Sequence, residues 1–381
     1  MRGITAARCR IIYDSFRWLP RYVAQRVTRR GTLPRPLHVM VALADHFEPS
    51  ILPDRPGSYA DMSEQERRLA RWCREYPAAV SRWRDADGRP FRHTYFFPAE
   101  QYDKRLIDPL AEHCQAGWGE IEVHLHHGVT VPATADDTRR ELVEFRDQLA
   151  ARGCLSRWNG TGPARYAFVH GNWALANVGN GVACGVDEEM AILAETGCYA
   201  DMTLPSAPAP TQIAKINALY ECARPLAQRA PHRAGRDLRA GRPPQVFPLM
   251  VQGPLAARVG RSVTGWPKAR IENGEMTGAN PPTQERMAHW LRARITVAGR
   301  PDWLFVKLHC HGMDPRDEAA MLGAPLQQFL AAVTTDRSVA VHFVTAREMV
   351  NVILAACDGR DGNPGDYRDY RLRLIAQPRM P

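Results

Sequence analysis

The stretch that decides the fold is HVMVALADHFEP, residues 38–49, in which a short apolar run is followed directly by acidic and histidine side chains. A run of this length, rich in Val and Leu, is typical of a buried strand. In α/β barrels the functional side chains gather at the carboxyl ends of the strands. The stretch therefore predicts a strand that delivers Asp45, His46 and Glu48 to a functional site.

Similar apolar runs recur along the chain and alternate with helical patterns. Strands are predicted at residues 38–43, 93–97, 121–126, 166–169, 198–203, 246–251, 303–308 and 339–343. Helices are predicted at 64–76, 103–114, 138–151, 187–196, 284–296, 315–334 and 345–357, the last with Thr345 as N-cap and Glu348 at the capping-box position. This alternation predicts an α/β fold with a parallel sheet, and the number of runs fits an incomplete (β/α) barrel. Two long segments, 228–245 and 253–282, are expected to be rim loops.

The composition is that of a soluble globular protein: 381 residues, 45% hydrophobic and 24% charged. These values exclude disorder as the main state of the chain. The nine cysteines are scattered and never form a CxxC pair. They argue against a disulfide framework or a zinc ribbon, and they predict a reducing, cytoplasmic location.

The positive charge is concentrated at the N-terminus. The first thirty residues hold eight arginines and one aspartate, a net +7, so the rest of the chain carries only +2 of the total +9. This distribution argues against a nucleic-acid partner. We expect residues 1–35 to form a basic amphipathic helical segment, residues 36–360 the main domain and residues 361–381 a tail. The basic segment either packs on the domain, which we prefer, or contacts an anionic membrane surface through residues 1–30.

Other predicted strands also end in histidine or acidic side chains. His124, His126 and His127 stand at the end of one, His170 and Trp173 follow another, Asp201 ends a third, and His309 and His311 end a fourth. Because residues i and i+2 of a strand share a face, His124 can act with His126, and His309 with His311. Imidazoles with carboxylates predict a divalent metal site. No GxSxG, GxGxxG, P-loop or HExxH motif is present, so hydrolysis by metal-activated water fits best.

The order of these motifs resembles that of the NodB-homology polysaccharide deacetylases, carbohydrate esterase family 4. Asp45, with His46 and Glu48, resembles their first motif, and EIEVHLHH at 120–127 resembles the second. ETGCYADMT at 195–203, LHCH at 308–311 and FVTAREM at 343–349 are similar to the later motifs. The spacing departs from the family in two places. Glu48 stands three residues after Asp45, and the position four residues after His124 is Gly128 rather than histidine.

The resemblance implies an incomplete barrel that binds a divalent metal, zinc before others, and hydrolyses an acyl amide or ester on a carbohydrate. It implies that Asp45 is a base or a ligand and that His309 is the acid. The implied metal ligands are His46, Glu48 and His124, with His126 or His127. The residues implied to contact the sugar are His170, Trp173, Asp201 and His311. The altered spacing keeps an alternative open. In that alternative the protein is a non-catalytic carbohydrate-binding or envelope-polysaccharide assembly protein on the same fold.

Overall fold

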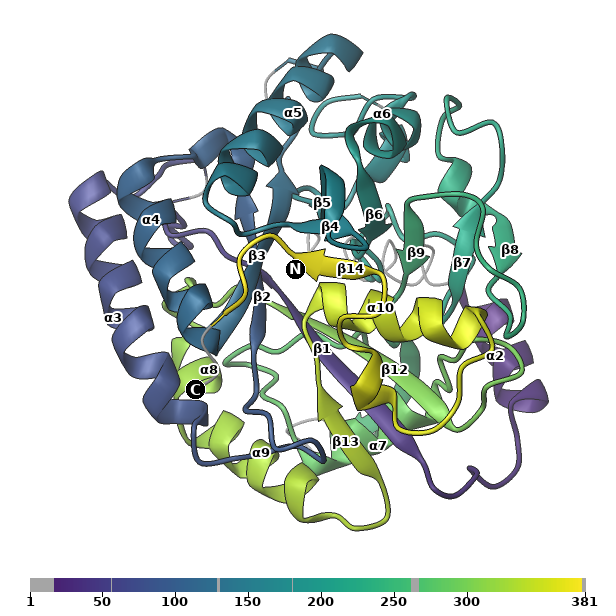
Figure 1. Ribbon diagram of the computed structural model, residues 1–381. Coiled ribbons are helices and arrows are strands. Elements are labelled where there is room, and N and C mark those ends of the chain that lie inside the picture. The colour runs from purple at the N-terminus through teal and green to yellow at the C-terminus, as the bar shows by residue number, and fades with distance from the viewer. Residues whose placement is uncertain (1–16, 56, 129–130, 180, 262–266, 379–381) are drawn as a thin grey trace.

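A large, mostly parallel sheet lies at the centre of the computed structural model, which describes residues 17–378 apart from 56, 129–130, 180 and 262–266 (Figure 1). Its main path runs, in order, through β12 (Trp303–Cys310), β1 (His38–His46), β2 (His93–Pro98), β3 (Gly119–Leu125), β5 (Thr161–His170), β6 (Cys198–Asp201), β9 (Leu249–Val251), β7 (Leu219–Cys222) and β8 (Gly235–Asp237). Three short strands join from the side: β13 (Ala340–Phe343) on β1, β4 (Ser156–Trp158) on β5, and β14 (Leu372–Leu374) on β4.

The strands from β12 to β9 along this path pair in parallel, whereas β7 and β8 extend the sheet antiparallel. The predicted mixed α/β architecture is therefore confirmed. A barrel is not, because β12 and β8 remain the two ends of the path and the described strands form no closed sheet. The parallel order still brings the carboxyl ends of β1, β3 and β12 to one edge, which is the condition for a shared site.

The sheet is buried on both faces because apolar side chains alternate between two hydrophobic clusters. Val39, Val41 and Leu43 of β1 belong to one cluster, and Met40, Ala42 and Ala44 to the other. The first cluster packs on α3 (Met62–Val80), α4 (Lys104–His113), α5 (Ala135–Ala151), α6 (Glu189–Thr196), α7 (Gln284–Arg292) and α9 (Ala324–Thr335). The second packs on α10 (Ala346–Cys357), so we call the two sides the outer face and the α10 face.

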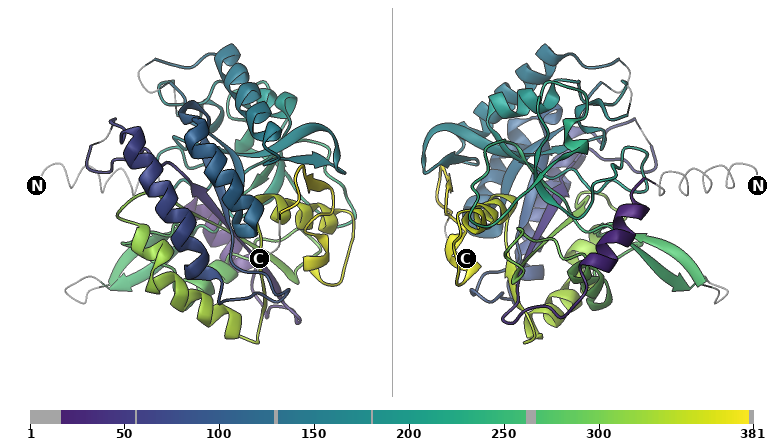
Figure 2. Two further views of the ribbon diagram at one scale, coloured as in Figure 1. Left: turned by 60° about the vertical axis from the view of Figure 1, so that its left-hand side comes forward. Right: turned by 90° about the vertical axis from the view of Figure 1, so that its right-hand side faces the viewer.

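All eight predicted strands contain a strand in the structure, and every predicted helix contains a helix. The helix expected over 315–334 is two helices, α8 (Glu318–Leu322) and α9, separated at Gly323. The segment 253–282 is not only loop: it forms the hairpin of β10 (Ala256–Arg261) and β11 (Pro267–Glu272), which projects from the body (Figure 2). The segment expected as a C-terminal tail contributes β14 to the sheet.

The described part of the basic N-terminal segment is the helix α2 (Leu19–Thr28), which packs on the domain. Trp18 is buried, the Gln25 side chain donates to Ile216 O at 2.8 Å, and Arg29 donates to Ala293 O at 2.6 Å. Residues 1–16 lie outside the described residues. Among the described helices, none is long and apolar enough to cross a bilayer.

A buried ion-pair network ties α10 to the sheet. The predicted capping box is confirmed, with Thr345 and Glu348 each bonding the other's backbone N–H. Glu348 also contacts Arg92 and Arg368, and Arg347 pairs with Glu120 of β3 at 2.7 Å. Burial alone would raise the pKa of Glu348, but the charges of Arg92, Arg368 and Arg347 lower it to about 2.

Glu348→Gln tests this network, because glutamine keeps the capping box and removes only the charge. We expect a loss of about 3–5 kcal/mol in the free energy of unfolding at pH 7, since three buried arginines lose a partner. Urea unfolding measures it, with Glu285→Gln at an exposed position as control. The difference in free energy of unfolding between wild type and Glu348→Gln should shrink as the pH falls from about 4.5 towards 2, because Glu348 takes up a proton in this range. An equal loss of unfolding free energy in Glu348→Gln and Glu285→Gln would show that the buried ion pairs of Glu348 do not stabilise the fold.

Candidate metal centre

Glu48 lies at the centre of a group of imidazoles at the carboxyl edge of the sheet. It follows β1, and it shares one set of neighbouring ligand atoms with His124 and His126 and a second set with His46 and His311. Within each set the candidate ligand atoms lie within 4.8 Å of one another. The structure therefore brings together five residues named from the sequence, and it places four nitrogen donors around one carboxylate, a donor set suited to a divalent metal.

His124 and His126 are oriented by hydrogen bonds on the side away from Glu48. His124 Nδ1 donates to Val169 O at 3.0 Å, and His126 Nδ1 donates to the Glu100 carboxylate at 2.7 Å. Their Nε2 atoms lie 3.4 and 3.7 Å from Glu48 Oε1. His124 Nε2 has no hydrogen-bond partner despite complete burial. Each ring thus turns a lone pair towards Glu48 in the manner of metal-binding histidines, whose other nitrogen is held by a carbonyl or carboxylate.

Gly171 leaves the room that His126 needs. A Cβ atom at this position would lie 2.3 Å from Cδ2 of the His126 ring, so any larger residue would displace the ring.

Burial and neighbouring charges shift the pKa values of this group in different directions. Burial would raise the pKa of Glu48, but its interactions with His124, His126 and His311 outweigh this effect and lower it to about 2. Burial lowers the pKa of His46 well below its usual range, and the neighbouring His311 and His124 lower it further. Burial likewise lowers the pKa of His124. Burial would also lower the pKa of His126, but the carboxylates of Glu100 and Glu48 raise it. Metal ligands must be deprotonated, so His46 and His124 are ready to bind, whereas His126 would release a proton on binding.

His309 and His311 share a face, as their i, i+2 spacing predicts, but they have different neighbours. The rings of His311 and His46 are 4.8 Å apart, which places His311 with the ligand set and not only beside a substrate. His309 lies farther away, 6.4 Å from the His46 ring, and its buried Nδ1 has no hydrogen-bond partner. Trp173 covers this region: it stacks on His46 at 4.8 Å and meets the edge of His309 at 5.2 Å.

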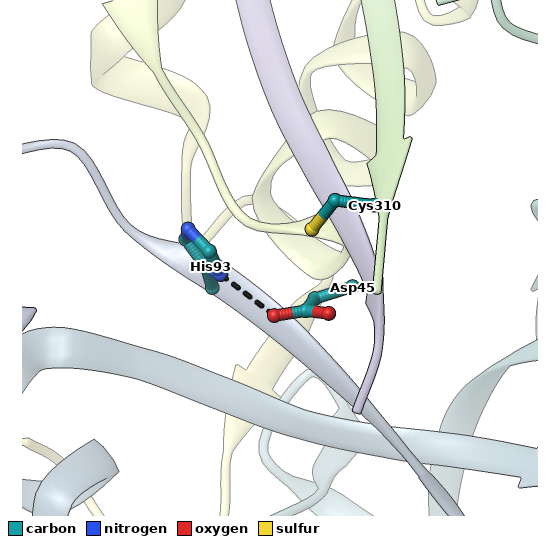
Figure 3. Close-up of side chains that lie close together, drawn as sticks. All are labelled: Asp45, His93 and Cys310. Atoms are coloured by element: carbon teal, nitrogen blue, oxygen red, sulfur yellow. Dashed lines mark hydrogen bonds and ion pairs between the residues drawn. The ribbon is translucent and has the colours of Figure 1, made fainter. Parts of the chain in front are cut away.

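Asp45 does not join the ligand set around Glu48, contrary to our expectation. Strand alternation turns it to the outer face, where His93 Nδ1 donates to its carboxylate at 3.0 Å, close to Cys310 (Figure 3). Its other oxygen accepts the backbone N–H of Gly312 at 2.7 Å. Asp45 therefore fixes the loop that follows His311, and its carboxylate belongs to a separate candidate group with His93 and Cys310.

His127 and His170 also lie apart from the Glu48 group. Their rings stack at 4.8 Å, and His127 Nε2 bonds Glu189 Oε1 at 2.6 Å in a fully buried cluster. His170 Nδ1 accepts the backbone N–H groups of Asn172 and Ala174, so its role is to shape the loop that carries Trp173. Of the two alternatives left open by the sequence, His126 is the one placed beside His124.

Asp201 lies in the buried interior next to the site. Its carboxylate accepts the Thr203 hydroxyl at 2.7 Å, and burial raises its pKa to about 7. Lys307, two residues before His309, is buried and donates to Met202 O at 2.7 Å. Burial lowers the pKa of Lys307 to about 7, although the charge of Asp201 opposes the shift. Asp201 has no exposed atoms with which to contact a sugar in this conformation.

A cavity of about 480 Å³ opens beside His311 and gives the metal centre access to solvent. Its lining includes Ile51, Glu275, Asp314 and Asp317. A larger cavity of about 510 Å³ lies where Leu33, Asn217 and Leu304 meet, and it contains none of the candidate ligands. The smaller cavity is therefore the natural place for a substrate.

Several site residues escaped sequence reasoning. Glu100 follows the carboxyl end of β2, so the rule applied to the other strands would have found it. Glu275 comes from the loop after β11 and bridges by backbone to His309, a contact that only the folded chain creates. Neither residue stands in a recognisable motif.

Metal affinity should depend on Glu48 more steeply than on Glu100. Glu48→Gln removes the only carboxylate shared by both ligand sets, and we expect it to abolish tight binding of a divalent metal. Glu100→Gln weakens only the orientation of His126, and about 10–100-fold lower affinity is expected. Competition with a chelator measures both, and Glu66→Gln on the exposed face of α3 is the control. Unchanged affinity in Glu48→Gln would place the metal elsewhere.

Comparison with known proteins gives little outside support. No family model matches the sequence, and no curated protein matches it. Among solved structures, an alpha-mannosidase from Enterococcus faecalis V583 is similar to this chain with a TM-score of 0.36 and 9% sequence identity. The match covers 83% of this chain and 29% of the mannosidase, so the chain spans less than a third of that enzyme. A likeness this weak transfers neither fold nor activity.

Proposed function

We propose that the protein is a divalent-metal hydrolase that removes an acyl group from a sugar or polysaccharide. The observation that carries the proposal is the ligand set around Glu48, in which His124 and His126 already donate their Nδ1 protons outward. The choice of an acylated carbohydrate rests on the order of motifs in the sequence, which resembles that of NodB-homology deacetylases.

The residues present fit zinc best. Glu48, His46, His124, His126 and His311 offer one carboxylate and four imidazoles, and zinc in proteins favours such nitrogen and oxygen ligands. When bound, a zinc ion supplies Lewis acidity and lowers the pKa of a coordinated water to about 7. The unpartnered nitrogens of His46 and His124 are what supports a bound ion here, because a buried polar atom without a partner costs free energy.

His309 is the residue that would move the proton. Burial and the charge of Lys307 lower the pKa of its ring well below the usual range, so the ring is a weak base that readily gives up a proton once it has accepted one. Its buried Nδ1 has no hydrogen-bond partner. It would take a proton from the attacking water and give it to the leaving nitrogen or oxygen of the sugar. The base role first expected of Asp45 passes to His309, since Asp45 is bonded to His93 and Gly312.

The cavity beside His311 would hold the carbohydrate. Its polar lining from Glu275, Asp314 and Asp317 offers acceptors for sugar hydroxyls. One face of Trp173 is already stacked on His46, so its contribution would be to exclude water from the ligand set.

Two single variants separate metal binding from proton transfer. His124→Ala should lose the metal, because a ligand contributes to affinity directly. His309→Ala should keep it and lose about 10²–10⁴-fold in kcat, because a proton carrier acts only in the transition state. Metal analysis and hydrolysis of acetylated amino sugars or acyl esters measure both effects.

His232→Ala is the matched control, since His232 is a buried histidine outside the ligand set. It should keep both metal and rate. If His309→Ala contains no metal, His309 is a metal ligand and its assignment as the proton carrier is wrong. If both variants keep full metal content and the wild type hydrolyses none of these substrates, the protein is better described as the non-catalytic carbohydrate-binding alternative.

A further inference from the structure

A third cavity, which contains none of the candidate metal ligands, lies where α2, β10 and α7 meet. It measures about 170 Å³. Its lining consists of Tyr22, Arg26, Ala256, Ala257, Arg258, His289, Arg292 and Ala293. Three arginines and a histidine line it, and none of its lining residues within the described part of the chain is acidic. The composition fits a group with negative charge.

The arginines of this cavity are poorly neutralised within the described part of the chain. Arg26 and Arg292 are exposed and form no ion pair there. The nearest carboxylate to Arg258 belongs to Glu272, whose Oε2 lies 3.9 Å from Arg258 Nε. Glu272 is already held by Arg286 at 2.7 Å, and Arg258 Nε is buried without a hydrogen-bond partner. Arg258 Nη2 donates to Asn280 Oδ1 at 3.4 Å, so Nε is the donor of this arginine that the described residues leave without a hydrogen bond.

The hairpin adds a like-charge pair at the same place. Arg258 of β10 stands directly opposite Arg270 of β11 in the register of the two strands. Like charges in directly opposed cross-strand positions destabilise a hairpin. An anion seated between the strands and α2 would offset this repulsion.

Aliphatic side chains lie next to these charges on the open side of α2. Val23 and Val27 stand one turn apart and are 57% and 55% exposed, among the most exposed large apolar residues described. Arg26 on the same helix and Arg30, just after its C-terminal end, are also exposed. Figure 2 shows α2 and the hairpin side by side on one side of the molecule. Paired apolar and basic side chains are the pattern of a segment that rests on a membrane surface.

We propose that this region, the α2 face of Val23, Val27, Arg26, Arg258 and Arg292, docks on a surface of anionic phospholipid. A lipid phosphate occupies the cavity and accepts hydrogen bonds from the arginines. Val23 and Val27 enter the boundary between headgroups and acyl chains. The exposed valines favour a lipid over a nucleic acid, since a sugar-phosphate backbone offers them nothing to contact.

The test is sedimentation of the full chain with vesicles of phosphatidylcholine, with and without phosphatidylglycerol. Wild type should bind only the anionic vesicles, and added salt should weaken the binding. Arg26→Gln with Arg292→Gln should weaken partition roughly 30-fold, because each basic residue near such a surface contributes about a factor of five. Val23→Ser with Val27→Ser should also weaken it. The matched control is Arg140→Gln with Arg337→Gln, which removes two exposed arginines from elsewhere.

Each other outcome overturns the proposal. Equal loss in the control pair would show general charge attraction. If Arg26→Gln with Arg292→Gln binds anionic vesicles as strongly as wild type, another segment makes the membrane contact. If inorganic phosphate raises the melting temperature of wild type through these two arginines while vesicles do not bind, the cavity serves a free anion. If a DNA oligonucleotide binds and vesicles do not, the partner is a nucleic acid. The midpoint of urea unfolding should be the same in all variants, which excludes misfolding as the cause.

Discussion

The arrangement at the carboxyl edge of the sheet depends on one buried carboxylate, Glu48. Taking an ionised carboxylate out of water is costly unless other groups compensate for its charge. Here His124, His126 and His311 compensate, and they hold the pKa of Glu48 at about 2. Those imidazoles are held in turn by Val169 O and Glu100. The buried nitrogens of His46 and His124 that have no hydrogen-bond partner beside this carboxylate are the physical basis for placing a metal there.

Residues on both faces of the sheet position the side chains around Glu48. On the α10 face, the ligands stand above a buried layer in which Glu120 pairs with Arg347 and Glu122 accepts from the Tyr199 hydroxyl. On the outer face, Asp45 bonds the backbone of Gly312 and so fixes the chain that carries His311. The strands thus fix the positions of the candidate ligands, and hydrogen bonds on the opposite face fix the conformation of the loop that carries His311. Both are needed, because metal sites tolerate little error in ligand placement.

The sequence predicted the strands well and the grouping of side chains only in part. Buried parallel strands are near-continuous apolar runs, so 38–43 and 303–308 were recognisable. Strand alternation correctly paired His124 with His126. The same rule, applied to neighbours, would have separated Asp45 from His46 and His126 from His127, since successive side chains point to opposite faces. The β10–β11 hairpin was missed because its segment is rich in Gly, Pro and Arg and lacks a clear alternation. Glu275 reaches the site only through tertiary contact.

The most direct test of a Glu48-centred metal site is X-ray absorption spectroscopy of the zinc-loaded full chain. The account predicts a first shell of nitrogen and oxygen only, at about 2.0–2.2 Å, with the outer scattering of several imidazoles. Zinc bound at the buried group of Asp45, His93 and Cys310 would instead show a sulfur ligand at about 2.3 Å. Zinc bound at the buried group of His127, His170 and Glu189 would also show only nitrogen and oxygen, but its spectrum would survive in Glu48→Gln, whereas the Glu48-centred site predicts its loss. A sulfur ligand, or failure to bind zinc at all, would contradict the central claim.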